Sequence, residues 1–377
     1  MERIKTLFLR TAVLSACMIA CVAGFSLAAD NSEPLVQPVL PMVRAMGGAF
    51  TAVANDENAV FYNPAGYALV EEGIITVFSL GIKVNIDDSA LKLYNAILSG
   101  VDVTSSGNLD TYLSDTTIAP GLTGPIYFGR VGNNFGFTFY NSININMDTR
   151  PGGLLPTARL SAYSDIGFVG GYGHTLPFLP DLYAGINLKV VLRAKSQIEG
   201  TVLEVIDQAS DTSEIPLSKA VGFGGDLGVL YFPSSWFSVA LCAKDVWGTR
   251  FSSWDALNES IPFERSLIKP RIAFGVAFYP LVTGGETKNF SDFTIAADYS
   301  DLLDYSSVFT NIKLGVSFKT LKILTVRSGF DAGYPTLGVG FDLNVFHFDI
   351  AYFVDETGSY TGSQPVQNLM LNFAFKW

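Results

Sequence analysis

Few side chains of this sequence have the types and spacing that chemistry requires. The chain has only two histidines, His174 and His347, and His347 lies two positions before Asp349. Residues two apart share one face of a strand, so these two can form a hydrogen-bonded pair, but no nucleophile motif accompanies them. A structural pair is therefore the favoured interpretation. No residues have the spacing of metal ligands either, so the sequence predicts no catalytic residue, no metal site and no cofactor.

The remaining candidates for chemistry are one glycine-rich run and the cysteines. Residues Gly222 to Gly225 lie within a strand pattern with no helix after them, so they do not form a phosphate-binding loop. Cys17 and Cys21 lie in a leader segment and Cys242 stands alone in the rest of the chain, which predicts no intrachain disulfide. The net charge of −11 argues against nucleic acid as a partner. The sequence thus indicates a protein that is not an enzyme.

Composition points to a membrane protein without membrane helices. Charged residues make up 16% of the chain and aromatic residues 13%, and glycines number 36. Beyond the first 30 residues no apolar run reaches the length of about 18 residues that a spanning helix needs. A chain of 377 residues could form two soluble domains, but barrels commonly run this long as one domain. Together these features predict a transmembrane β-barrel.

The first 29 residues read as a secretory signal peptide. Arg3, Lys5 and Arg10 form a basic region, an apolar core follows, and small residues precede the expected cleavage after residue 29. Residues 14–17 resemble a lipoprotein cleavage box, but Arg10 leaves too little apolar length before it. Removing the signal takes away three basic residues and Glu2, which moves the net charge from −11 to about −13.

Beyond residue 70 the chain consists of segments in which apolar and polar residues alternate. In the first of them Phe78 and Ile82 fall on one face, and Ser79 and Lys83 on the other. This period of two is the signature of a barrel wall with one face in lipid. Fourteen such segments begin near residues 74, 124, 135, 160, 183, 219, 236, 270, 292, 310, 322, 334, 345 and 366. The count is even, as bacterial single-chain barrels require, so we expect an all-β, 14-stranded antiparallel transmembrane outer-membrane barrel.

The last segment ends on aromatic residues. Phe373, Phe375 and Trp377 share one face of it, and the sequence closes on Trp377. Such a strand resembles the signal by which barrel-assembly machinery selects outer-membrane proteins, so this machinery is an expected partner. The resemblance also places the C-terminus on the periplasmic side.

Connection lengths are consistent with that orientation. The expected periplasmic turns are short, whereas the alternate connections are mostly longer, with a short one near Gly333. Short turns inside and long loops outside are typical of outer-membrane barrels. A β-sandwich, the structural alternative, would show shorter strands and no such bias.

The stretch Met42–Val70 precedes the strands and has a different pattern. Apolar residues have helical spacing as far as Val53, but Gly47 and Gly48 interrupt it, each at a cost of about 1 kcal/mol in a helix interior. Such a cost indicates that the backbone approaches something closely. Residues 57–62 predict one helical turn, which ends before Asn63-Pro64-Ala65-Gly66 because a residue before proline is pushed out of the helical region. On pattern alone this is a small helical hairpin packed on a core.

Part of this stretch resembles the N-terminal hatch of the FadL-like outer-membrane transporters. The residues that carry the resemblance are Gly47, Gly48, Ala49, Ala52, Ala54, Asp56, Ala59, Asn63, Pro64, Ala65 and Gly66. PorV-type barrels share this signature, and residues 327–336 look like the final third of PorV-type and spirochaete FadL-like barrels. The resemblance implies a barrel of residues 71–377 in the bacterial outer membrane, in contact with its lipid. Residues 30–70 would form a hatch that plugs the lumen.

The resemblance also implies a function. FadL-like barrels are channels for long-chain fatty acids and aromatic hydrocarbons, so we expect passive uptake of hydrophobic small molecules, with fatty acids as the leading example. The hatch motif Gly47, Gly48, Asp56, Asn63, Pro64, Ala65 and Gly66 would gate the channel. The alternative, implied by PorV-type barrels, is a scaffold that hands secreted proteins to a surface machine. The inward-facing residues of the present sequence are mostly small or charged, and this favours the alternative. A general porin for polar solutes fits poorly with a plug.

The first long loop is the expected substrate groove. Ser89 can cap a helix that Gly100 ends, and an apolar stripe at helical spacing lies between them. The candidate groove residues are Leu91, Tyr94, Ile97, Leu98, Tyr112 and Leu113, with Trp247, Phe251 and Trp254 as the opposite wall. The stripe could instead pack on its neighbours, because spacing establishes only amphipathicity.

Charged residues on the inward faces of the strands are the last candidates. Inside a barrel such charges must be paired or hydrated. Either they form a solvated wall, or some of them pair with Arg44, Asp56 or Glu57 and hold the hatch in place while leaving it displaceable. A break in the third strand, through which such channels release substrate sideways, has only Gly136 and Pro151 as candidates.

Overall fold

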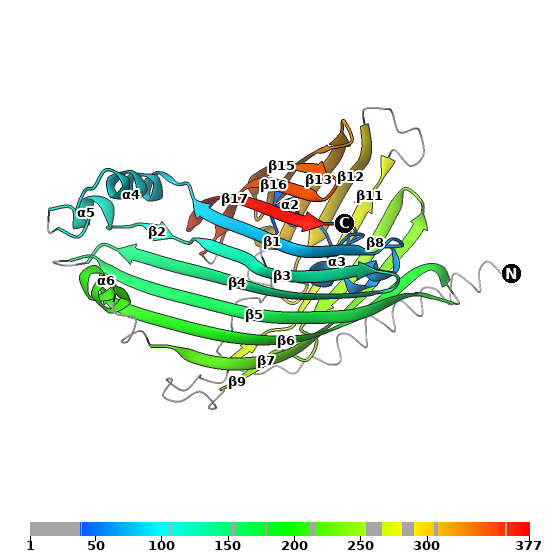
Figure 1. The fold of residues 1–377 in the computed structure, drawn as a ribbon, viewed down its shortest axis with the longest axis horizontal. Helices are drawn as coiled ribbons and strands as arrows, with labels where there is room; N and C mark the ends of the chain where they lie inside the picture. Colours follow the sequence, from blue (N-terminus) through cyan, green and yellow to red (C-terminus); the bar gives the residue numbers. More distant parts are fainter. Residues whose placement is uncertain are drawn as a thin grey trace.

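The structure, a computed structural model, is a closed barrel of fourteen antiparallel strands. It describes residues 38–377 apart from 39, 106, 153–154, 178, 211–215, 254–265, 281–289, 305–307 and 359, so the expected signal peptide lies outside the described residues. The barrel closes because the first wall strand, β1 (Ile74–Asn85), pairs with the last, β17 (Pro365–Lys376), as well as with β3 (Gly121–Gly132). Figure 1 shows β1 lying between these two strands. The predicted fold class is confirmed.

The remaining wall strands follow the chain in order. They are β4 (Phe135–Arg150), β5 (Thr157–Leu176), β6 (Leu179–Thr201), β7 (Ser218–Ser234), β8 (Phe237–Lys244), β11 (Arg271–Phe278), β12 (Phe290–Tyr299), β13 (Ile312–Thr320), β14 (Leu324–Asp331), β15 (Tyr334–Leu343) and β16 (Phe346–Glu356). Three short strands, β2 (Thr117–Ile118), β9 (Thr249–Ser253) and β10 (Ser266–Ile268), pair along the extended part of the wall. Each observed wall strand begins within four residues of its predicted start.

The two ends of the barrel differ. At one end, called the turn side, strands are joined by turns such as Asn133-Asn134 and Asn344-Val345, and β17 ends there. At the other end, the loop side, the connections are longer except at Ala332-Gly333. Strands β4 to β7 have 16 to 23 residues, against 8 to 11 for β13 to β16. At about 3.3 Å per residue, β6 is roughly 50 Å longer than β14, so one side of the wall extends far beyond the other.

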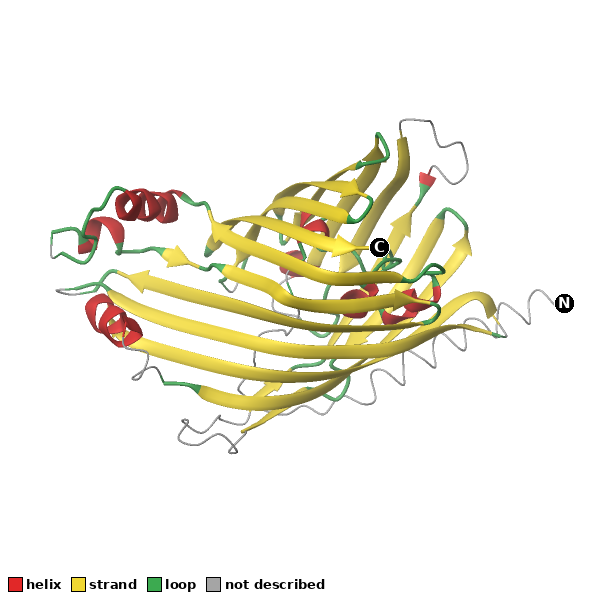
Figure 2. Ribbon diagram, in the orientation of Figure 1, coloured by secondary structure: helices red, strands yellow, loops and turns green. Residues whose placement is uncertain are grey.

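Two groups of helices accompany the wall (Figure 2). Inside the barrel lie α2 (Pro41–Ala45), α3 (Ala59–Tyr62) and the 3-10 helix η1 (Pro64–Ala68), which we call the hatch together with residues 46–58 and Asn63. On the loop side lie α4 (Asp88–Leu98), α5 (Leu109–Tyr112), α6 (Val202–Ser210) and α7 (Val308–Asn311). No helix in the described ranges has the length and apolar character needed to cross a bilayer.

Alternation along the strands gives the wall an apolar outer face. Phe139, Phe168, Val190 and Phe223 are cross-strand neighbours on β4 to β7, and all four are exposed. The residues that alternate with them along each strand face the interior and are mostly small or polar. At the turn side Trp236 packs on Phe278 while Trp377 packs on Phe375, which corresponds to one aromatic girdle of a membrane barrel.

The hatch departs from the predicted helical pattern in one respect. The apolar periodicity predicted a helix running toward Val53, but α2 ends at Ala45 because Gly47 and Gly48 adopt φ angles of +62° and +78°. Only glycine takes up these angles without strain. The second turn is also shorter than expected, since α3 begins at Ala59 rather than Glu57.

We expect a charged substitution on the outer face to destabilise the barrel more strongly the deeper it lies in the membrane. Leu188 is 61% exposed in the middle of β6, and Leu188→Arg should lower the free energy of unfolding in lipid by about 2–4 kcal/mol. The control is Leu217→Arg, at an exposed residue beside the loop-side end of β7, for which the expected loss is about 0–1 kcal/mol. Urea-dependent unfolding in vesicles measures both. Equal losses would contradict the assignment of this face to lipid.

Candidate functional site: two lumen cavities separated by the hatch

Two cavities lie inside the barrel on opposite sides of α2. The loop-side cavity has a volume of about 450 Å³ and is lined by Arg44 and Gly48 of the hatch together with residues of the 300–311 connection. The turn-side cavity has a volume of about 1080 Å³ and is lined by Met42 and Met46 together with Asn344 and Trp377. Because Met42 and Met46 face one cavity while Arg44 and Gly48 face the other, α2 forms the partition between them.

The second half of the hatch is anchored to the wall by neutral contacts. Asn63 is fully buried; its side-chain amide donates to the carbonyl of Thr51 at 3.0 Å, and its Oδ1 accepts from Ala65 N at 3.1 Å. The latter bond caps η1, whose first residue is Pro64. The buried Tyr67 hydroxyl donates to Asn187 Oδ1 on β6 at 2.7 Å. The Asn63 side-chain amide also lies 3.3 Å from the carbonyl oxygen of Val229 on β7, so the Asn-Pro-Ala-Gly run and the adjacent Tyr67 are joined to two wall strands by neutral hydrogen bonds.

Wall glycines make that close approach possible. A Cβ on Gly228 would lie 2.0 Å from Asn63 Oδ1, one on Gly185 would lie 2.3 Å from Pro64, and one on Gly136 would lie 2.3 Å from the Tyr67 ring. Any side chain at these positions would displace the hatch. Glycines of β4, β6 and β7 therefore form the seat for η1.

The first half of the hatch also approaches the wall closely at a glycine, here a glycine of the hatch itself, on the opposite side of the barrel. Gly47 lies against the carbonyl oxygens of Leu314 and Phe330, each 2.4 Å from a Cβ at that position. The carboxylate of Asp298 accepts from the backbone N–H groups of Phe50 at 2.9 Å and Thr51 at 2.8 Å. These bonds satisfy buried donors that the broken helix leaves open. The close approach of Gly47 to the wall backbone accounts for the glycine interruption of the helical pattern.

Ion pairs join the hatch to the wall at both cavities. On the loop side the Arg44 guanidinium pairs with Asp331 at 2.7 Å and with Asp355, and it stacks on the Phe353 ring at 4.2 Å. On the turn side the carboxylate of Glu57 pairs with Lys376 at 2.6 Å. Two of the three hatch residues expected to reach wall charges therefore do so.

Asp56 differs from its neighbour. Its carboxylate accepts from the backbone N–H of Asn58 at 2.8 Å, a bond within the hatch, and no ion pair joins it to the wall in the described part of the chain. Burial, followed by the adjacent Glu57 charge, raises the pKa of Asp56 to about 7. Burial acts in the same direction on Glu57, but the Lys376 ammonium outweighs it and lowers the pKa of Glu57. The pKa values of these two adjacent carboxyl groups thus shift in opposite directions, because only Glu57 forms an ion pair with a cation among the described residues.

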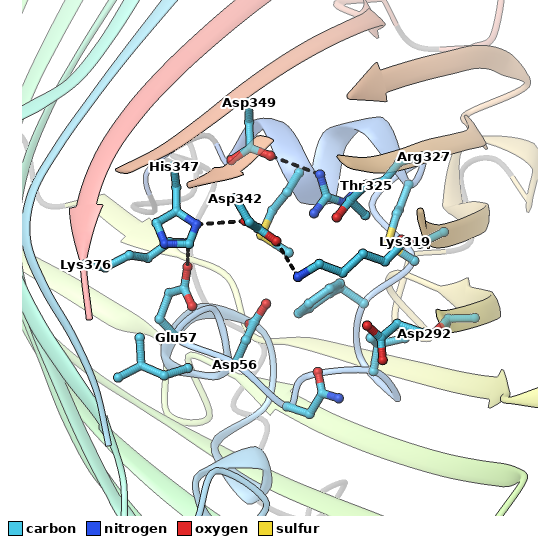
Figure 3. A pocket seen from close by; sticks show the side chains of 18 of the residues that line it. Asp56, Glu57, Asp292, Lys319, Thr325, Arg327, Asp342, His347, Asp349 and Lys376 are labelled. Carbon is cyan, nitrogen blue, oxygen red and sulfur yellow. Dashed lines mark hydrogen bonds and ion pairs between the residues drawn. The ribbon is translucent and has the colours of Figure 1, made fainter. Parts of the chain in front are cut away.

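Paired charges also line the turn-side cavity (Figure 3). Asp342 accepts from Lys319 at 2.7 Å and lies 2.8 Å from His347 Nδ1, and Arg327 pairs with Asp349 at 2.9 Å. The predicted pairing of His347 with Asp349 is therefore wrong: the two share a face of β16, but His347 pairs with Asp342 on the adjacent strand β15, and Asp349 pairs with Arg327 on β14, one strand further along. No group of three His, Cys, Asp or Glu residues that could hold a metal occurs among the residues the structure describes.

The candidate groove residues lie in three different environments. On α4, Leu91, Ile97 and Leu98 are exposed and Tyr94 is half-buried. Tyr112 and the buried Leu113 belong to a separate apolar cluster with α6.

The expected opposite wall is not assembled in one place. Phe251 is buried in the hatch cluster, Trp247 covers Gly225 on the outward face of the wall, and Trp254 lies outside the described residues. The structure therefore does not gather these residues along one groove, and their role in binding stays a prediction. The helix itself is capped by Asp87, whose carboxylate accepts from Ala90 N, rather than by Ser89.

The assembly-signal residues lie as the alternation predicts. Phe373 is exposed on the outward face and stacks on Phe346, while Trp377 packs edge-on against Phe375. Their role in assembly stays a prediction. The predicted strand break is not at Gly136, which pairs regularly with Val131 and Gly171, or at Pro151, which follows β4. Instead the pairing of β3 with both neighbours shifts register around Gly124-Pro125.

Two basic residues of the loop-side cavity were not singled out from the sequence. Lys244 and Arg271 are directly opposite each other on β8 and β11, and both line this cavity. The Lys244 ammonium lies 4.6 Å from the centre of the Tyr62 ring. Within the described ranges no ion pair joins either cation to a carboxylate. The alternation of apolar and polar residues predicts that both side chains face inward. Their position opposite each other depends on the register of β8 and β11, which a long connection separates.

Comparisons with known proteins bear on the fold. No family model matches the chain, and no match is found among curated proteins. Among solved structures, the toluene transporter TodX of Pseudomonas putida aligns with a TM-score of 0.50 and 12% identity over 91% of this chain and 99% of that chain. The CymD monoaromatic hydrocarbon channel gives a TM-score of 0.49 with 12% identity over 89% and 96%, and a Pseudomonas aeruginosa FadL homologue gives 0.45 with 11% over 93% and 99%. The chain therefore shares its barrel fold with the toluene transporter TodX.

The glycine seat can be tested by adding a single methyl group. Gly228→Ala places a Cβ against Asn63, so it should destabilise the folded barrel by about 1–3 kcal/mol, as overpacking does. Gly107→Ala is the matched control, because nothing lies within 4 Å of a Cβ there. Urea unfolding of refolded protein in vesicles measures both. An unchanged midpoint for Gly228→Ala would show that the hatch does not occupy this seat.

Proposed function

We propose that this protein is a bacterial outer-membrane channel for passive uptake of hydrophobic molecules that carry an acidic head group, with long-chain fatty acids as the leading example. The observation that supports this most is the Lys244–Arg271 pair, which faces a lumen cavity beside the hatch and forms no ion pair with a carboxylate among the described residues. In this proposal the loop side faces the exterior and the turn side faces the periplasm. The chain would act without catalysis, cofactor or energy source.

The basic pair has the properties of a carboxylate site. Like charges directly opposite on antiparallel strands repel each other, typically by about 0.2–1 kcal/mol. Two carboxylates near the pair already accept hydrogen bonds: Asp298 accepts from the hatch backbone, and Asp301 accepts from Ile272 N at 3.3 Å and Leu303 N at 3.0 Å. An incoming carboxylate would relieve the repulsion and gain charge-assisted hydrogen bonds.

Exposed apolar side chains lie close in the chain to residues that line the same cavity. Leu302, Val308 and Phe309 are 41%, 57% and 70% exposed, and they adjoin Asp304 and Thr310 of the cavity lining. Exposed apolar residues around a polar pocket are typical of a site for an amphiphile. An acyl chain would contact these residues while its head group reaches the basic pair.

The hatch suggests how passage would occur. Its second half is held by buried neutral contacts in the glycine seat, whereas the first half, which includes α2 between the two cavities, is held in addition by the ion pairs of Arg44 and Glu57. Movement of this first half, residues 40–58, would join the cavities. An exit through the wall at Gly124-Pro125, where the ladders of β3 are interrupted, is the alternative to release from the turn side.

Removing the ion pairs of the hatch should open the channel. Arg44→Ala leaves Asp331 and Asp355 without this partner, and Glu57→Gln removes the charge that pairs with Lys376. Both variants should show higher single-channel conductance in planar bilayers than the parent protein. Asp56→Asn is the matched control and should leave conductance unchanged, because Asp56 bonds within the hatch. Unchanged conductance in both Arg44→Ala and Glu57→Gln would refute the proposal that the hatch can be displaced.

The head-group site predicts selective loss of binding. The double variant Lys244→Met, Arg271→Met should weaken binding of a fluorescent long-chain fatty acid about tenfold or more, since a hydrogen bond to a charged group contributes about 1.5–3 kcal/mol. Binding of the corresponding long-chain alcohol should change little. Lys322→Met, in an exposed turn-side position, is the control for loss of a cation outside the cavity. Equal loss for acid and alcohol would point to a structural role for the pair.

A secretion scaffold remains the second candidate. The observation that favours it is the turn-side cavity, whose lining is largely charged or polar and whose cations are already paired. Such a lining offers little to an acyl chain. If the folded, heat-modifiable barrel binds neither the acid nor the alcohol, the scaffold becomes the favoured function, and capture of a surface protein by the intact barrel would be sought next.

A further inference from the structure

Helix α4 has an apolar face that nothing in the described structure covers. Ala90, Leu93 and Ala96 form its buried face. On the opposite face Leu91 is 42% exposed, Leu98 is 85% exposed, and the half-buried Tyr94 lies between them at helical spacing. Leaving such a stripe in water is unfavourable by roughly 25 cal/mol for each Å² of apolar surface.

The buried face of α4 belongs to a cluster on the outside of the wall. Leu93 packs in one apolar cluster with Ile198 of β6, and Met147 and Leu160 pack against that cluster. Met147, Leu160 and Ile198 are register partners on β4, β5 and β6. They have the same parity as the exposed Phe139 row, so α4, α5 and α6 cover the outward face of the extended wall. They do not line the loop-side cavity, whose residues all come from other segments.

The N-terminal end of α4 lies near the edge of the lipid-facing band. On β4 that band runs from Phe135 at the turn side to Ile145, both exposed; ten residues at about 3.3 Å, on a strand tilted by about 40°, span roughly 25 Å of bilayer. On β1 the last exposed apolar residue is Val84, three positions before the Asp87 cap of α4. Figure 1 shows α4 directly beyond the loop-side end of β1. The exposed face of the helix thus continues the lipid-facing surface of the barrel.

We propose that α4 is an interfacial helix whose Leu91–Tyr94–Leu98 face lies in the outer leaflet of the membrane, against the acyl chains. Tyr94 takes the interfacial position that aromatic side chains occupy in membrane proteins. Lys92, exposed on another face of the helix, stays in water. For helices of this kind the apolar face is buried by about 5–10 Å at the boundary between head groups and acyl chains. This inference depends on the barrel lying in a membrane and not on what the channel carries.

The test is the depth of a nitroxide attached at position 98. The label is placed on Leu98→Cys in the full chain, with Cys17→Ser, Cys21→Ser and Cys242→Ala removing the other thiols, and the barrel is reconstituted in phospholipid vesicles. Collision rates with molecular oxygen, which partitions into lipid, and with a water-soluble nickel chelate are then measured. The ratio of oxygen to chelate collisions should be several-fold higher than for a label at Lys92→Cys.

Two reference positions make the outcome unambiguous. A label at Leu188→Cys, in the lipid-facing band, gives the ratio for a fully lipid-exposed site, and the label at position 98 should approach it. A ratio at position 98 equal to that at position 92 would place the face in water and overturn the proposal. A ratio that becomes lipid-like only after a fatty acid is added would also overturn it, because the face would then be a docking site for the solute.

Discussion

The structure depends on one steric constraint: a peptide segment can lie against the inside of a barrel wall only where the wall has no side chains. A barrel of fourteen strands leaves a lumen that its own inward side chains do not fill. Here the remaining space is filled by some thirty residues of the same chain, whose backbone contacts the wall at inward-facing glycines. Gly228 accommodates Asn63, Gly185 accommodates Pro64, and the carbonyl groups of β13 and β14 lie against Gly47. The position of the hatch is thus determined by missing side chains on both surfaces.

Once the hatch is seated, polar groups must be satisfied within a nearly closed space. Its broken helices leave backbone donors open, and Asp298 accepts from two of them. Many charged side chains of the wall are paired with one another or with the hatch, as unpaired buried charges would be costly, whereas Lys244 and Arg271 form no ion pair among the described residues. Both halves of the hatch make buried hydrogen bonds to the wall, as at Tyr67 and Ala45, but α2 is held in addition by the ion pairs of Arg44. The half that divides the lumen is therefore the half that depends in part on interactions that water and ions can replace.

The sequence predicted the wall well because alternation is a local property. Strand number, strand starts within four residues and the difference between the two ends all follow from periodicity and connection length. The glycine pair at 47–48 was correctly predicted to mark a close approach, although not its partner, since Leu314 and Phe330 are distant in the chain. Cross-strand partners depend on register, so His347 was paired with Asp349 instead of Asp342. For the same reason the facing of Lys244 and Arg271 was missed.

A polar lumen and an apolar cargo are compatible when the cargo is an amphiphile. A pure hydrocarbon gains nothing from the basic pair and would displace water from charged groups on its way to the turn side. A carboxylate instead offers each cation along the lumen an alternative partner: first Lys244 and Arg271, then Arg44, whose bonds to Asp331 and Asp355 hold α2 in place. Exchanging one carboxylate for another at Arg44 costs far less than leaving the guanidinium unpaired, because the ion remains neutralised throughout. An acidic head group would therefore act on the same interaction that keeps the two cavities apart. The polarity of the lumen, which at first argues against a lipid channel, is then what couples arrival of the ligand to movement of the hatch.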